Sequence, residues 1–192
     1  MTEPIRIAMI LGSTRPGRFC DTVAAWTGEA IRRAGGFELD VVDPLLVDLP
    51  VHHPREPHAR VRDLRARIGR ADAAMVVTPE YNHGYPAALK HVVDLVGPEW
   101  RAKPVGFVSY GGLSGGIRAV EQLRGVFAEL HAVTIRDAVA FPNASERFGT
   151  DGALIEPPRF ERQAHVMLER LRWWAAALRA ARTVEPYPAG IA

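Results

Sequence analysis

Three short segments of the chain combine residue types suited to binding an anionic ligand with a planar ring. The first, Gly12–Arg18, reads GSTRPGR and carries hydroxyl groups on Ser13 and Thr14 and guanidinium groups on Arg15 and Arg18. These groups donate hydrogen bonds, and those of arginine are charge-assisted. The segment follows an apolar run and opens a helical pattern, where backbone N–H groups favour an anion. We therefore predict a phosphate cradle, with an ordinary turn capped by hydroxyl groups as the alternative.

The pattern of this first segment also indicates the kind of phosphate. Position 14 is threonine, so the G-x-G-x-x-G pattern of dinucleotide-binding turns is absent from it. It is not followed by the Gly-Lys-Ser/Thr of a Walker A loop either. A terminal monoester phosphate is the best match.

The second segment, Thr78–Pro86, reads TPEYNHGYP and places rigid Pro79, aromatic Tyr81 and the amide of Asn82 close together. A planar heteroaromatic ligand needs such an apolar wall with hydrogen bonds at its edge. Alternatively, Tyr81 is a buried loop aromatic and Glu80 a solvated or capping carboxylate. A nucleophilic Glu80 would need a second carboxylate, which the sequence does not identify.

The third segment, Ser109–Gly116, reads SYGGLSGG. Its four glycines let the backbone approach a ligand closely and leave N–H groups unhindered. The alternative is a flexible glycine loop before a helix.

Hydrophobic periodicity predicts the elements that must position these segments. Strands are expected at 6–11, 37–42, 73–78, 105–109 and 132–135, with an optional continuation of the last at 139–141. Apolar residues at helical spacing predict helices over 23–34, 61–68, 85–96, 117–130 and 160–178. Residues 44–58 and 143–158 are expected to be loops. The chain length suits a single domain over 1–184, followed by a frayed tail at 185–192.

This alternation predicts an α/β fold, a flavodoxin-like doubly wound five-stranded parallel sheet, order 2-1-3-4-5, with helices on both faces. Ligands of such sheets bind beyond the carboxyl ends of the strands, where the winding direction changes. The three segments follow the first, third and fourth strands, so we expect them at one edge of the sheet.

The order of these motifs resembles the NADPH-dependent FMN reductases of the flavodoxin-like superfamily, which include quinone, chromate and azo-dye reductases. The resemblance covers residues 5–130. Its marks are Gly12–Arg15, Pro79–Asn82 with Pro86–Lys90, Trp100 with Lys103-Pro104, and Ser109–Gly112 with Gly115-Gly116.

The resemblance implies bound FMN, with NADPH or NADH as co-substrate. It assigns the phosphate to Ser13, Arg15 and residues 18–20, and the isoalloxazine ring to Pro79–Asn82 and Ser109–Gly112. The whole expected set is Gly12, Ser13, Thr14, Arg15, Arg18, Phe19, Cys20, Pro79, Glu80, Tyr81, Asn82, Ser109, Tyr110, Gly111 and Gly112. In one departure, many members carry Ser or Asn where this chain has Arg18, Phe19 and Cys20.

The function that we expect is hydride transfer from nicotinamide to flavin N5, then to flavin, quinone or another small acceptor, by a ping-pong mechanism. The flavin carries this chemistry, so no side chain is assigned as catalytic. The resemblance also implies a homodimer or homotetramer, paired through residues 84–96. One alternative is a flavodoxin-type electron carrier, although a net charge of +2 differs from the acidic surface of flavodoxins. Another is an FMN-free structural or regulatory protein.

Composition and short sequence patterns argue against several other classes of protein and of binding site. Nucleic-acid binding is not expected, because the sequence lacks a Lys/Arg-rich run with interleaved aromatic residues. Apolar runs stay below the ~18 residues of a membrane span, and no secretory signal pattern is present, so we expect a cytoplasmic protein. Cys20 cannot form an intrachain disulfide, and we expect a packing residue in preference to a reactive thiol. The spacing of His52, His53 and His58 matches no metal-ligand pattern.

Overall fold

A parallel five-stranded sheet forms the centre of the molecule. The structure is a computed structural model that describes residues 3–52, 54 and 58–188. Its strands are β1 (Ile5–Leu11), β2 (Phe37–Val42), β3 (Ala73–Pro79), β4 (Pro104–Tyr110) and β5 (Val133–Phe141). Their order is β2-β1-β3-β4-β5, which confirms the predicted fold class. Because β1 pairs with both β2 and β3, the winding direction changes at β1.

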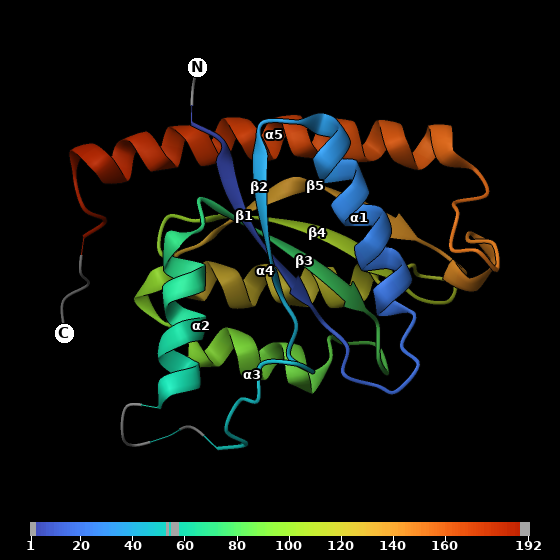
Figure 1. The fold of residues 1–192 in the computed structure, drawn as a ribbon, viewed down its shortest axis with the longest axis horizontal. Coiled ribbons are helices and arrows are strands. Elements are labelled where there is room, and N and C mark those ends of the chain that lie inside the picture. The colour runs from blue at the N-terminus through green and yellow to red at the C-terminus, as the bar shows by residue number, and fades with distance from the viewer. Residues whose placement is uncertain (1–2, 53, 55–57, 189–192) are drawn as a thin grey trace.

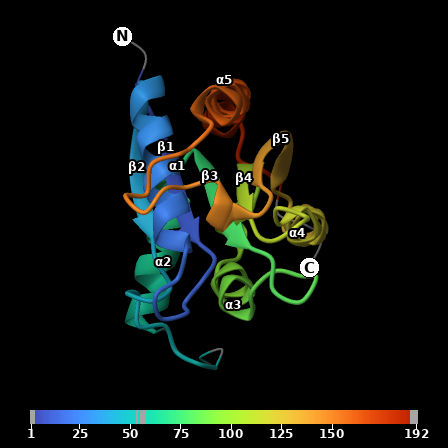
Figure 2. The same cartoon turned by 90° about the vertical axis from the view of Figure 1, so that its right-hand side faces the viewer.

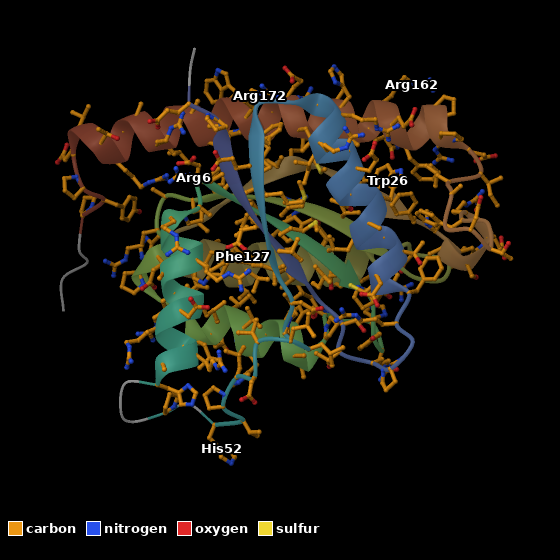
Figure 3. The ribbon with its side chains drawn as sticks, in the orientation of Figure 1. Arg6, Trp26, His52, Phe127, Arg162 and Arg172 are labelled. Atoms are coloured by element: carbon orange, nitrogen blue, oxygen red, sulfur yellow. The ribbon has the colours of Figure 1, made fainter. Side chains whose placement is uncertain are left out.

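Helices cover both faces of this sheet (Figures 1 and 2). One face carries α1 (Cys20–Ala34) and α5 (Pro157–Val184), and the other α2 (Ala59–Arg70), α3 (Ala87–Leu95) and α4 (Ile117–Glu129). Two apolar clusters result. The ring of Trp26 on α1 lies 5.0 Å from that of Phe141 in one cluster, and Phe127 on α4 lies 5.1 Å from Trp100 in the other (Figure 3).

The central strands follow the pattern of a sheet covered on both faces. Every residue of β3 and β4 is buried, so both strands read as unbroken apolar runs. The strand β5 runs without interruption from Val133 to Phe141, so the optional continuation at 139–141 belongs to the same strand. Its register shifts opposite 105–107, and this bulge accommodates Arg136 and Asp137 without ending the strand.

The prediction of a simple polar loop at 143–158 is wrong in part. Residues Ala144–Glu146 form a short 3-10 helix, and a second one, also not predicted, spans Pro98–Trp100. The side chain of Phe148 in this segment is buried against the core, and the centre of its ring lies 5.1 Å from that of Phe141. The last helix is longer at both ends than predicted. Residues 185–188 form neither helix nor strand, and 189–192 lie outside the described residues.

None of the helices in the described ranges has both the length and the apolar character that crossing a bilayer requires.

Lys103 is a charged residue inside the core, at the amino end of the sheet. Its side chain is 2% exposed and Nζ donates a hydrogen bond to the carbonyl of Ala71. Burial, together with the nearby charge of Arg182, lowers the pKa of Lys103 to about 8.

We expect Lys103 to contribute a rise in the free energy of unfolding between pH 8 and 10. The folded chain loses the Lys103 proton near pH 8, whereas an unfolded lysine keeps it to about pH 10.4, so the unfolded state binds more protons in this window. The gain approaches about 3 kcal/mol. Burial raises the pKa of the Cys20 thiol, which opposes this rise within the window, and that of the Tyr110 phenol, which opposes it above about pH 10.

Urea unfolding of the wild type and Lys103→Met from pH 7.5 to 9.5 checks this expectation. The variant should lose the rise. An equal rise in both proteins would assign it to other groups.

Candidate functional site

The three segments identified in the sequence meet at the carboxyl ends of β1, β3 and β4. A pocket of about 360 Å³ lies between them, within the size range of small-molecule sites. Its lining comprises Ser13, Arg15, Pro16, Gly17, Arg18, Phe19, Pro79, Glu80, Tyr81, Tyr110 and Gly111. Pro16 and Gly17 were not in the predicted set, although they stand inside the predicted segment. Gly12, Thr14, Cys20, Asn82, Ser109 and Gly112 belong to that set and lie outside this lining.

The first segment presents unpaired backbone donors at the start of α1. Within the described residues, the N–H groups of Thr14, Gly17 and Phe19 have no hydrogen-bond partner. Helix α1 has 15 residues, so its dipole adds positive potential at the same end. This arrangement fits a phosphate group.

Ser13, Arg15 and Tyr81 connect the first segment to the second. Ser13 is 1% exposed, and its Oγ lies 2.6 Å from the hydroxyl oxygen of Tyr81. The guanidinium carbon of Arg15 lies 3.8 Å from the centre of the Tyr81 ring, a cation–π contact. Arg15 therefore covers one face of the Tyr81 ring, and Tyr81 also lines the pocket.

Arg18 lies beneath the first segment, where its side chain is 5% exposed. Its Nη1 donates to the Ser13 carbonyl at 2.5 Å and to Asp43 Oδ1 at 2.8 Å, and Nη2 donates to Asp43 Oδ2 at 2.5 Å. The guanidinium of Arg18 holds the pKa of the Asp43 carboxyl below its usual range. The guanidinium group is thus paired within the protein.

Gly12 and Cys20 pack against the end of β3. The Gly12 N–H donates to the carbonyl of Val77 at 2.7 Å, and a Cβ at Gly12 would lie 3.0 Å from the same oxygen. Cys20 is fully buried, with Sγ 3.8 Å from the Val77 carbonyl. Burial raises the pKa of the Cys20 thiol, which favours the packing role over the reactive one.

The second segment turns tightly after Tyr81. The N–H of Tyr81 donates to the Gly84 carbonyl at 2.9 Å, and the Gly84 N–H returns a bond of 3.1 Å. Both residues between them are left-handed, Asn82 with φ 50° and His83 with φ 72°. Such strain is found at ligand sites in folded proteins. The turn directs exposed Asn82 away from the pocket lining.

Glu80 ties the second segment to the third. Its Oε2 accepts a hydrogen bond of 2.7 Å from the Ser114 hydroxyl, and Oε1 lies 3.3 Å from the guanidinium of Arg118. Its side chain is 9% exposed. Through these two partners the Glu80 carboxylate links the second segment to the third segment and to the start of α4. Within the described residues, no contact with a second carboxylate supports the nucleophile alternative.

The third segment has a rigid base and an open tip. Ser109 is fully buried and donates from Oγ to the Gly115 carbonyl at 2.8 Å. The Gly111 N–H bonds to the Phe141 carbonyl at 3.3 Å, whereas that of Gly112 has no partner among the described residues. Burial also raises the pKa of Tyr110, so this phenol stays protonated at neutral pH.

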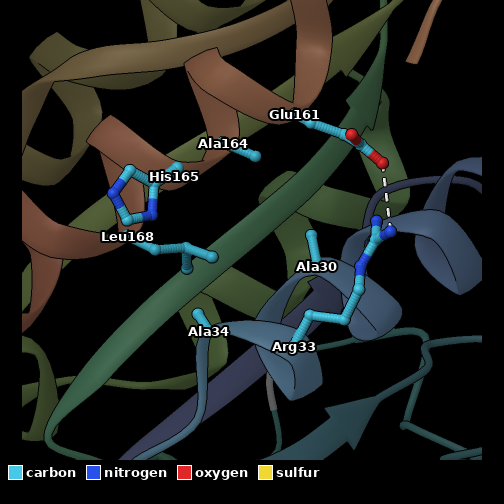
Figure 4. A pocket seen from close by; sticks show the side chains of 7 residues that line it. All are labelled: Ala30, Arg33, Ala34, Glu161, Ala164, His165 and Leu168. Carbon is cyan, nitrogen blue, oxygen red and sulfur yellow. Dashed lines mark hydrogen bonds and ion pairs between the residues drawn. The ribbon is translucent and has the colours of Figure 1, made fainter. Parts of the chain in front are cut away.

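Other candidate places lack these features. A cavity of about 240 Å³ lies between α1 and α5, where Arg33 and Glu161 form an ion pair at 3.0 Å (Figure 4). None of the three segments lines it. His52 points away from the body of the molecule (Figure 3), and His53 lies outside the described residues. In the described ranges, no group of three or more His, Cys, Asp or Glu side chains is arranged to hold a metal ion.

The family model and the curated relatives point to one family, and the solved structures share the fold. The model of the family "NADPH-dependent FMN reductase" matches residues 5–146. An NAD(P)H-dependent FMN reductase of Schizosaccharomyces pombe is 36% identical over 150 residues, which span 71% of this chain and 74% of the relative. A probable NADPH:quinone oxidoreductase of Oryza sativa is 33% identical over 183 residues, spanning 85% and 89%. Among solved structures, the flavoenzyme NAD(P)H:(acceptor) oxidoreductase FerB of Paracoccus denitrificans matches with a TM-score of 0.70 at 19% identity, covering 92% of this chain and 98% of that one.

Proposed function

The chain belongs to the NADPH-dependent FMN reductase family, and we propose that it is an NAD(P)H-dependent oxidoreductase with FMN as its cofactor. The observation that carries this proposal is the pocket at the switch point of the sheet, lined by all three segments. Its chemistry has two halves, an anion cradle at the start of α1 and an aromatic and glycine-rich wall beside it.

The residues present suit the two ends of FMN. The free N–H groups of Thr14, Gly17 and Phe19, with the charge of Arg15, would hold the phosphate. Tyr81 and the 109–112 backbone would flank the ring. When bound, FMN supplies two-electron chemistry, accepting a hydride from the nicotinamide and passing it to an acceptor. The unpaired Gly112 N–H is a donor available to negative charge on the ring.

We propose a small molecule as the second substrate, a flavin or a quinone. The relatives named above are an FMN reductase and a quinone oxidoreductase. Nicotinamide and acceptor would use the same open face of the ring in turn, which gives ping-pong kinetics.

Anaerobic stopped-flow mixing with NADPH tests the function. The purified protein should be yellow, and NADPH should bleach its flavin absorbance before any acceptor is added. A panel of flavins, quinones, azo dyes and metal oxyanions then identifies which acceptor restores the colour fastest. A bound flavin that NADPH leaves oxidised would instead indicate a flavodoxin-type carrier.

Tyr81→Ala is expected to weaken FMN binding by about 0.5–1.5 kcal/mol, the value of an aromatic contact. Tyr81→Phe is the matched control, because it keeps the ring and loses only the hydroxyl bond to Ser13. Fluorescence titration and thermal unfolding of both variants separate binding from folding. If Tyr81→Ala melts much earlier while its kinetics per bound flavin stay normal, Tyr81 has a structural role alone.

We also propose a homodimer or homotetramer, formed by one domain over residues 1–184. Leu113 and Ile117 are 87% and 53% exposed beside the pocket, and burying such apolar side chains favours association. A groove of about 470 Å³ also lies between α3, within the expected pairing segment 84–96, and α4. Sedimentation at micromolar concentration should give a dimer or tetramer, and a monomer would contradict the proposal. We propose a cytoplasmic location, because a chain with one cysteine has no disulfide framework of the kind typical of oxidising compartments.

A further inference from the structure

Asp43 stands directly after β2 and has no role in the sequence analysis, whereas Arg18 was expected to contact the phosphate. We propose that Asp43 is a positioning residue for the phosphate-binding segment and acts through Arg18, which holds the segment in place without touching the phosphate. This inference rests on the proposed function, because it concerns the same FMN site.

The hydrogen bonds and ion pairs of Arg18 engage its guanidinium within the protein. A guanidinium group has five N–H donors. One Nη1 bond goes to the Ser13 carbonyl, and one from each Nη goes to the Asp43 carboxylate, at 2.5–2.8 Å. Nε and Nη2 both lie 2.8 Å from Asp21 Oδ1. Four donors therefore make hydrogen bonds to protein oxygens, and Nη2 lies in addition within an ion pair with Asp21.

The charges around Arg18 lead to the same conclusion. One guanidinium faces two carboxylates, of Asp43 and Asp21, so the cluster of three side chains carries a net negative charge. A negative cluster does not attract a phosphate. Arg15 has no ion pair among the described residues, and it is the arginine of this segment whose charge is available.

Asp43 has the fixed position that an anchor requires. Its side chain is 10% exposed, and its Oδ1 also accepts the Leu45 N–H at 3.0 Å. Its carbonyl accepts the N–H groups of Leu46 and Val47 at 3.0 and 3.1 Å. These bonds join Asp43 to the turn after β2, so its carboxylate cannot follow a displaced Arg18.

The Arg18–Asp43 pair acts on the segment through the main chain of Ser13. The guanidinium bond to the Ser13 carbonyl sets the orientation of the next peptide, whose N–H belongs to Thr14. Ser13 also contacts Tyr81 through Oγ. The main chain of Tyr81 is held separately by its two hydrogen bonds with Gly84. Loss of the pair would therefore misdirect the unpaired donors of the cradle while the wall for the ring stays in place.

The test is titration of the flavin-free full chain with FMN and with riboflavin, which has the same ring and no phosphate. We expect Asp43→Asn and Arg18→Gln each to weaken FMN binding about tenfold or more, which is the loss typical of a buried charged hydrogen bond. Each variant should weaken riboflavin binding less than twofold. The double variant should lose no more than the weaker-binding single variant, because both changes break one connection. Asp21→Asn is the matched control, because this carboxylate is 63% exposed and its change should leave both affinities within twofold.

Arg18→Lys keeps the charge but loses the forked geometry, and it provides a second test where a neutral variant does not fold. Positioning predicts an FMN-selective loss close to that of Arg18→Gln. Near-normal FMN affinity in Arg18→Lys, or normal or increased FMN affinity in Asp43→Asn, would make Arg18 a direct ligand and overturn the inference. Equal losses for the two flavins would overturn it too, because they would indicate damage to the whole fold. A wild-type chain that binds neither flavin would contradict the proposed function itself.

Discussion

Ser13→Glu is expected to lower FMN affinity more than about a hundredfold, and Arg15→Ala about ten- to a hundredfold. The phosphate of FMN carries about −1.5 to −2 charge at neutral pH. Arg15→Ala removes a charge-assisted hydrogen bond worth roughly 1.5–3 kcal/mol. Ser13→Glu places a like charge beside the donors of Thr14 and Gly17, where unit charges 4 Å apart interact by about 4 kcal/mol near a protein surface.

Riboflavin and a neutral variant separate charge from damage to the fold. Ser13 is buried and contacts Tyr81, so any larger side chain disturbs this position. Ser13→Gln has the shape of the glutamate variant without its charge. We expect the two variants to bind riboflavin equally and to differ strongly for FMN. Matching losses for both flavins in Arg15→Ala would indicate damage to the fold or to the ring pocket. No loss for either flavin would mean that the phosphate lies away from this segment.

Gly116→Ala is expected to destabilise the chain by about 2–4 kcal/mol, the sum of a left-handed alanine and local overpacking. Gly116 has φ +86°, and a Cβ there would lie 2.8 Å from the Cβ of Ser109 and 3.0 Å from the N and O of Tyr110. Ser109 and Tyr110 belong to β4, which is buried, so its backbone cannot move aside. The glycine loop and the start of α4 would shift together.

Gly112→Ala is the control for this expectation. A Cβ at Gly112 meets nothing within 4 Å, and its φ is not in the left-handed region. Denaturant unfolding should show a normal midpoint for Gly112→Ala and a lowered one for Gly116→Ala. Equal midpoints for the two variants would mean that the loop adjusts without cost.

The sheet order and the edge that carries the pocket were predictable from the sequence. Strands covered on both faces have unbroken apolar runs, and alternation with amphipathic helices allows few topologies. The bulge in β5 was less clear, because Arg136 and Asp137 interrupt its apolar pattern. The inward packing of Phe148 was missed, because periodicity gives no signal in an irregular segment.

The sequence by itself determined that hydroxyl, guanidinium, aromatic and glycine residues gather at one end of the sheet, because strand order fixes which loops are neighbours. Only the tertiary structure decided how the two arginines of the first segment divide their roles. Arg18 is paired with Asp43, 25 positions further along the chain, while Arg15 lies on Tyr81. Local sequence gives two arginines the same donors and charge. Their partners come from distant strands, and the choice between a buried ion pair and an available cation depends on which carboxylates the fold brings within bonding distance.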